Sequence, residues 1–292
     1  FLIILNFILS FLMILFIILS IAFITLYERH LLGLSQNRLG PNKVLFLGVL
    51  QAGLDGVKLM SKEQILVKNS SDLYFLFVPA VSFIFMFLEW LSLPFFFFFM
   101  NFQFSFLFLL CLVGFSVYFT IISGLMSNSK FSFLGAIRSS SQSVSFEIAF
   151  SIFFLIFMFF VNGFNFVKIF NFLGFFIFYP FLILVLSELN RAPFDFSEGE
   201  SELVSGFNTE HSSVSFIFLF LGEYGVLIFF SVLMSLLFFN FSYVFCFLYF
   251  TLLLLIRSAY PRFRYDLLMN LFWKIILPLS LFMFFIYWLI LF

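Results

Sequence analysis

The sequence predicts an all-α membrane protein of about eight transmembrane helices, and three observations support this fold class. Hydrophobic residues make up 64% of the 292 residues and charged residues only 10%. A soluble domain carries roughly 25% charged residues, so this chain has too few polar side chains to cover itself in water. Its apolar runs are about 20 residues long, which suits a bilayer core of ~30 Å. They lack the alternation of polar and apolar residues that barrel strands show over about ten positions.

The predicted spans form one transmembrane domain over residues 1–292, because no polar linker divides them. They are centred within residues 3–26, 73–93, 104–126, 146–166, 169–187, 214–236, 241–257 and 274–292. The first run is too long for a signal peptide, and neither a basic leader nor a small-residue cleavage site accompanies it. Between the first two spans, residues 44–60 alternate apolar and polar positions at helical spacing. They predict a short amphipathic helix at the membrane surface.

The basic residues predict the orientation of the chain in the membrane. Of the 14 Lys and Arg residues, all but Lys168 lie in four loops with their flanks, at 27–72, 127–145, 188–213 and 257–274. The positive-inside rule places these loops on the cytoplasmic or matrix side, with both termini across the membrane. The formal net charge of zero excludes a basic nucleic-acid binder, so nucleic acid is not an expected partner.

Cysteine and histidine are too scarce for a metal or iron–sulfur centre within this chain. It contains Cys111, Cys246, His30 and His211. An Fe–S cluster usually takes four thiolates, and a structural zinc site takes four Cys or His ligands. The sequence also lacks a phosphate-binding glycine loop and a Ser-His-Asp arrangement. We therefore expect no self-contained active site, and any redox centre is expected in a partner.

Acidic residues are concentrated directly after the fifth predicted span. Residues 187–202 read Ser-Glu-Leu-Asn-Arg-Ala-Pro-Phe-Asp-Phe-Ser-Glu-Gly-Glu-Ser-Glu. A solvated loop is the ordinary interpretation of such a cluster. Glu188, however, ends an apolar helix, and the apolar stretch after Glu202 favours packing against protein. Carboxylates crowded at low dielectric repel one another, so some bind protons near neutral pH, as a proton relay or a redox-linked switch requires.

Three more carboxylates, Glu89, Glu147 and Glu223, fall in or near predicted spans. Ionisable groups at membrane depth are expensive and usually face a partner or a water-filled cavity. Glu147 follows a serine-rich run that suits bound water, and Glu223 precedes Tyr224, a candidate hydrogen-bond partner. The alternative for both is a protonated or paired structural carboxylate. Glu89 lies beside Trp90 near a span end and is predicted to be interfacial.

Four motifs of the chain resemble NADH–quinone oxidoreductase chain 1, the family of membrane subunits at the heel of respiratory complex I. They are Glu28-Arg29-His30 with Gln-Asn-Arg-Leu-Gly-Pro-Asn at 36–42, Glu-Leu-Asn-Arg-Ala-Pro-Phe-Asp at 188–195, residues 198–208, and residues 257–266. The resemblance runs nearly end to end, with the motifs in matching order. The extreme hydrophobicity and the 59 phenylalanines look like those of a mitochondrially encoded version.

The resemblance implies part of a quinone-binding tunnel, with ubiquinone or a related quinone as substrate and neither FMN nor an Fe–S cluster bound by this chain. It implies partners among the other membrane and soluble subunits of complex I, including those with the terminal Fe–S cluster, together with membrane lipids. It also implies the mitochondrial inner membrane, with the charged loops facing the matrix. The implied tunnel residues are Arg29, Arg38, Asp55, Lys58, Asp195, Glu198, Glu200 and Glu202, and the implied proton-coupling residues are Glu147, Glu188 and Glu223.

Two other interpretations compete with this one. A stand-alone ion-coupled secondary transporter would use the acidic loop and the buried glutamates as an ion pathway. Such transporters often contain internal repeats or broken helices, and the two halves of this chain show no convincing repeat. A purely structural scaffold would explain the helices but not the crowding of carboxylates after the fifth span.

Overall fold

The computed structural model is helical and contains no strand over the residues that it describes, which are 2–65, 72–94, 103–166, 174–197, 199 and 206–291. The helices are α1 (Leu2–Ser35), α2 (Gln51–Ser61), α3 (Asp72–Leu91), α4 (Ser105–Met126), α5 (Lys130–Val161), α6 (Phe175–Glu188), α8 (Ser213–Phe239), α9 (Tyr243–Ala259), α10 (Tyr265–Leu271) and α11 (Leu277–Leu291). Short turns lie at η1 (Phe46–Gly48) and η3 (Gly206–Asn208), and η4 (Phe272–Ile276) joins α10 to α11.

Within these described ranges, six helical segments are long and apolar enough to cross a membrane, and two shorter apolar helices lie at Phe176–Glu188 and Tyr243–Ala259. Together they correspond to the eight apolar runs of the sequence, although residues 169–173 of the fifth run lie outside the described residues. The predicted all-α membrane fold class is confirmed.

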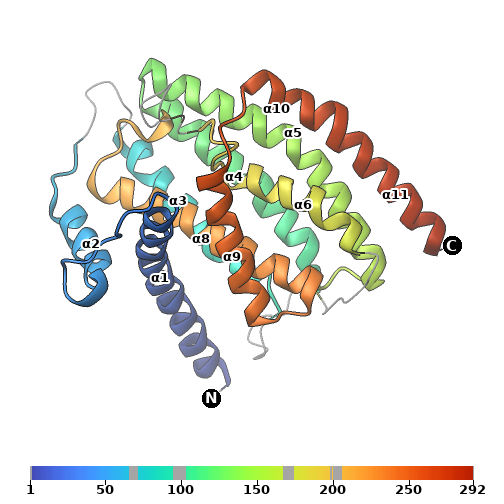
Figure 1. Cartoon of the computed structure of the whole chain (residues 1–292), viewed down its shortest axis with the longest axis horizontal. Helices are drawn as coiled ribbons and strands as arrows, with labels where there is room; N and C mark the ends of the chain where they lie inside the picture. Colours follow the sequence, from blue (N-terminus) through green and yellow to red (C-terminus); the bar gives the residue numbers. More distant parts are fainter. Residues whose placement is uncertain are drawn as a thin grey trace.

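Helix α5 occupies the middle of the fold and contacts α4, α6 and α11 (Figure 1). Helix α8 packs against α3 and α9, while α1 lies at one edge against α8 and α9. The contact between α5 and α6 is made largely of phenylalanine. Phe150 and Phe181 are fully buried, and their rings stack with centroids 5.5 Å apart. This aromatic packing fixes the end of α6, from which the acidic loop departs.

The prediction of a polar loop at 127–145 is wrong, because α5 begins at Lys130. Ser129 caps the helix by accepting a hydrogen bond from the backbone N–H of Ser132 at 3.3 Å. The serines further along donate to backbone carbonyls three residues earlier, as Ser139 Oγ does to the carbonyl of Ala136 at 3.0 Å. A hydroxyl satisfied in this way is compatible with a buried helix, so the polar composition did not indicate a loop.

The structure moves three further boundaries. Helix α1 continues to Ser35, and the last span begins at Tyr265, so Lys274 lies within a helix. The amphipathic helix is confirmed over Gln51–Ser61 and is shorter than predicted, because η1 forms a separate turn before it. None of the residues of α2 is buried, and the helix stands at the outer edge of the fold beside α1 (Figure 1).

Candidate functional site: a polar cavity beneath the acidic loop

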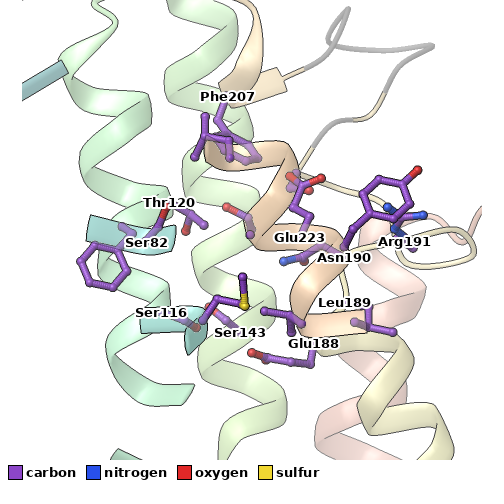
Figure 2. A pocket seen from close by; sticks show the side chains of 18 of the residues that line it. Ser82, Ser116, Thr120, Ser143, Glu188, Leu189, Asn190, Arg191, Phe207 and Glu223 are labelled. Atoms are coloured by element: carbon purple, nitrogen blue, oxygen red, sulfur yellow. The ribbon is translucent and has the colours of Figure 1, made fainter. Parts of the chain in front are cut away.

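A cavity of about 220 Å³ lies among α3, α4, α5 and α8 and is bounded by the end of α6 and the loop that follows it (Figure 2). Carboxylates from four different segments line it. They are Glu89 of α3, Glu188 of α6, Asp195 of the acidic loop and Glu223 of α8. Residues that are far apart in the sequence therefore share one cavity.

Hydroxyl groups of α3, α4 and α5 line the cavity, and four of them are labelled in Figure 2. They belong to Ser82, Ser116, Thr120, Ser123, Ser139 and Ser143. Each of the six donates to the backbone carbonyl three residues earlier, at 2.7 to 3.0 Å. Each hydroxyl oxygen also has two acceptor lone pairs. The wall is thus polar without leaving a hydroxyl donor unsatisfied.

Glu28 of α1 is the centre of a buried charged network beside the cavity, with only 3% of its surface exposed. Arg191 Nη1 lies 3.3 and 3.2 Å from its two carboxylate oxygens, and Arg257 Nη1 binds Oε1. Tyr224 donates to Oε2 at 2.6 Å. The network ties α1, α8, α9 and the acidic loop together. It also brings together residues from three of the predicted charged loops, those at 27–72, 188–213 and 257–274.

Arg191 is held on two sides within this network. Its guanidinium carbon lies 4.0 Å from the centroid of the Tyr224 ring. Burial alone would lower the pKa of Arg191, but Tyr224, Glu28 and Glu223 raise the pKa above its ordinary value. The guanidinium therefore stays charged, and its electrostatic interactions reach Glu223 as well as Glu28.

The acidic loop is anchored at several points. Asp195 Oδ2 lies 3.2 Å from Arg262 Nη2, and its Oδ1 accepts a hydrogen bond from the Gly199 N–H at 3.4 Å. From α5, the buried Gln142 Nε2 donates to the Ser187 carbonyl at 2.9 Å and to the Phe194 carbonyl at 3.1 Å. These bonds fix where the loop leaves α6 and where it crosses the cavity.

Glu188 is directed into the cavity, toward the helices that carry Ser116 and Ser143, and Glu223 lies nearer Arg191 (Figure 2). Glu188 also interacts electrostatically with Glu147 of α5. Glu147 is accommodated by Gly114 of α4, where a Cβ atom would stand only 2.7 Å from Glu147 Oε1. The absence of a side chain at Gly114 provides space for the carboxylate.

The structure separates the implied tunnel residues into two places. Asp195 lines the cavity, whereas Arg29 and Asp55 form an ion pair of 2.9 Å between α1 and α2, with side chains 47% and 43% exposed. Arg38 is exposed and donates to Gln36 at 2.7 Å, and Lys58 is exposed on α2. Glu198, Glu200 and Glu202 lie outside the described residues.

The prediction that Glu89 is interfacial stays a prediction, and the structure adds that only 3% of its surface is exposed. It lies near the end of its span as expected, but α3 packs between α4 and α8, so the residue faces the cavity. The structure also pairs Tyr224 with Glu28 rather than with its neighbour Glu223. Consecutive helical residues do not face the same direction.

Sequence reasoning about sites missed Glu28, Arg191 and Arg257. All three were visible as charged residues at the ends of apolar runs, and all three lie within the motifs that carry the family resemblance. Their mutual contacts join positions more than 160 residues apart. No linear spacing expresses such a contact, because it depends on how the helices pack.

The fold and the cavity define a multi-pass helical membrane protein with a charged network at one end of its spans. The chain belongs to the NADH dehydrogenase family, whose model matches residues 8–288. NADH-ubiquinone oxidoreductase chain 1 of Aedes aegypti is 40% identical over 93% of this chain and 91% of that protein. The protein of the same name from Artemia franciscana is 41% identical over 95% and 96%. The one from Locusta migratoria is 40% identical over 98% and 95%.

Proposed function

We propose that this chain is a core membrane subunit of a proton-pumping NADH–ubiquinone oxidoreductase, in which it forms part of the quinone tunnel and carries the first carboxylates of the proton pathway. The observation that supports this most directly is the shared cavity. It is lined both by Asp195 of the acidic loop and by Glu188 of a membrane helix. A charge that appears at the loop therefore acts on a membrane carboxylate across one shared cavity.

On the quinone side, the acidic loop supplies Asp195 together with Glu198, Glu200 and Glu202. The second group, Arg29, Arg38, Asp55 and Lys58, borders the tunnel from α1, α2 and the segment between them. Reduction of a quinone consumes electrons and protons together, and the electrons come from an Fe–S cluster in a partner subunit. The exposed surface of α2 offers those soluble subunits a place to dock. This chain itself binds neither FMN nor a cluster.

On the membrane side, the proton-coupling residues are Glu188, Glu147 and Glu223. The electrostatic interaction between Glu188 and Glu147 and the one between Glu223 and Arg191 supply the physical link. Unit charges a few ångströms apart interact far more strongly at low dielectric than in water. A change in protonation at the loop therefore alters the protonation of Glu188, and Glu188 in turn acts on Glu147.

We place the chain in the mitochondrial inner membrane with its charged loops facing the matrix. The clustering of Glu28, Arg191 and Arg257 supports a single charged side, because it joins the flanks of three basic loops. The expected partners are the other membrane and soluble subunits of the complex, together with lipid around the apolar helices.

The test replaces Glu188 with Gln in the assembled complex. NADH oxidation with an artificial acceptor reports the redox subunits, and proton uptake by membrane vesicles reports pumping. We expect the variant to keep the first activity and to lose proton pumping. Normal pumping with normal quinone turnover would overturn obligatory coupling at Glu188. The matched control is Glu63→Gln, which removes an exposed carboxylate outside this cavity.

Native electrophoresis distinguishes the complex from a stand-alone transporter. Migration of this chain with a very large band that oxidises NADH supports the proposed subunit. A small band without that activity, in a gel where the large complex survives, supports the transporter instead.

A further inference from the structure

Glu89 is a buried acid that the proposed function does not use. It lies near the end of α3 with 3% of its surface exposed, and it lines the cavity that contains Glu188. Its Oε2 atom is buried and has no hydrogen-bond partner among the described residues. The neighbouring Ser92 hydroxyl donates to the backbone carbonyl of Glu89 at 2.6 Å, so it does not supply a hydrogen bond to Oε2.

An ionised carboxylate in this position is expensive, because burial of an unpaired charge costs several kcal/mol even after relaxation. The two guanidinium groups that line the cavity, those of Arg191 and Arg257, are already bound to Glu28. The polar lining residues of α4 and α5 carry hydroxyl groups, which are uncharged. Glu89 therefore has no dedicated counter-ion within the described lining, and a proton is the simplest means of neutralising it.

The acidic residue that acts on Glu89 is Glu188, with which it interacts electrostatically. Glu188 interacts in the same way with Glu147, so it stands between two carboxyl groups on different helices. The other titratable or charged groups that face the cavity are Glu223 and Tyr224 of α8, Arg191 and Asp195 of the loop, and Arg257 of α9.

We propose that Glu89 is an additional proton-transfer residue, which exchanges a proton with Glu188 across the hydroxyl-lined cavity. In this step the Glu89 carboxylic acid gives its proton to the Glu188 carboxylate and becomes a carboxylate, and the reverse transfer restores the acid when Glu188 is protonated again. Net charge is unchanged, and no electron or further reactant is required. One proton is thus shared between Glu89 of α3 and Glu188 of α6, and Glu188 also interacts with Glu147.

This inference rests on the proposed function, because the proton on Glu188 is supplied by events at the acidic loop. It also predicts that Glu89 acts through its ability to titrate rather than through its size. Glu89→Gln keeps the shape of the side chain and removes the titration. Glu89→Asp keeps the titration and shortens the side chain, which makes it the rescue variant.

The experiment uses the assembled complex and records infrared difference spectra between the oxidised and quinone-reduced states, together with proton pumping as a function of pH. We expect Glu89→Gln to lose one carboxylic-acid band and to shift the midpoint of the pumping profile to lower pH, because Glu188 then lacks a like-charged neighbour. Glu89→Asp is expected to retain an acid band. Glu63→Gln, outside the cavity, is expected to change neither measurement.

The inference is overturned if Glu89→Gln assembles and leaves the acid bands and the pH profile unchanged. It is also overturned if the Gln and Asp variants lose activity equally without a change in the bands, which is the behaviour of a merely structural residue. Glu188→Gln separates the two proposals. If it changes bands and pumping while Glu89→Gln changes neither, only the inference about Glu89 fails. If neither variant has an effect, the proposed coupling fails with it.

Discussion

The Arg191 guanidinium lies over the Tyr224 ring, with its central carbon 4.0 Å from the ring centroid, and both side chains bind the same Glu28 carboxylate. Three different segments thus share one buried anion. The arrangement fixes the acidic loop against α1 and α8, and it makes Glu28 a structural requirement for the cavity beside it.

Glu28→Gln is expected to destabilise the chain strongly. It leaves Arg191 buried without its counter-ion, and removing one partner of a buried ion pair costs about 3–5 kcal/mol. The melting temperature of the assembled complex measures the loss. Asp55→Asn is the comparison, because the Arg29–Asp55 pair is exposed and exposed pairs contribute about 0–1 kcal/mol. Equal shifts for the two variants would contradict the buried network.

Gly114→Ala is expected to impair proton translocation while the complex still assembles. The new methyl group would stand 2.7 Å from Glu147 Oε1, so the flexible carboxylate has to move. Gly222→Ala is the matched control, because this cavity-lining glycine of α8 has nothing within 4 Å of its added Cβ. Proton pumping per NADH oxidised distinguishes the two variants. A larger defect in Gly222→Ala would show that the position of Glu147 is not what matters.

Gln142→Leu is expected to loosen the acidic loop. It removes the hydrogen bonds to the carbonyls of Ser187 and Phe194, and each buried group left unsatisfied costs about 1–3 kcal/mol. Amide hydrogen exchange of residues 189–197 should become faster. In Ser141→Ala, which loses the bond from the Tyr265 hydroxyl, exchange should rise near Tyr265 instead. Unchanged exchange in the loop of Gln142→Leu would rule out this anchor.

His211 is expected to make stability depend on pH. Burial lowers the pKa of His211 to about 4, and its ring stacks on Phe75 with centroids 4.3 Å apart. In the unfolded chain the histidine pKa is about 6.5. Between pH 4 and pH 6.5, the unfolded chain therefore binds more protons than the folded chain. Stability is therefore complete above pH ~6.5 and falls as the pH falls toward 4, by about 2 kcal/mol at pH 5.

His211→Phe keeps an aromatic ring against Phe75 and removes the titration. Melting temperatures of the wild-type and variant complexes at pH 8 and pH 5 test the prediction. Between pH 8 and pH 5, the melting temperature of the variant complex should fall less than that of the wild-type complex. A difference that does not depend on pH would show that folding does not change the pKa of His211.

The sequence predicted the membrane fold because hydrophobicity acts locally: an apolar run of bilayer length forms a helix whatever its neighbours are. The serine-rich start of α5 was predicted wrongly because a local polar composition does not show how the hydroxyl groups are hydrogen-bonded. The stretch of α5 that includes Ser139 is polar in composition, but its hydroxyls are satisfied by the preceding turn of the helix. Composition therefore indicated a loop where the backbone continues as a helix.

The candidate site was predictable only in part. Glu188, Asp195 and Glu223 are carboxylates in unusual contexts, and the structure places all three on one cavity. Glu28 and Glu89 were not predicted to be site residues, because their importance depends on which helices meet around them. Glu28 has its two arginines on other segments, and the burial of Glu89 follows from the packing of α3 against α4 and α8.

The six cavity hydroxyls that donate to their own helices have a consequence for selectivity. With their hydrogens turned toward the backbone, they offer lone pairs to the cavity. This stretch of wall favours species that donate hydrogen bonds, such as hydronium or an undissociated acid, and offers small anions nothing in return. A hydroxyl hydrogen can rotate to suit its partners. The preference is therefore set by rotatable dipoles rather than by fixed charge, and it is reversed without any movement of a helix.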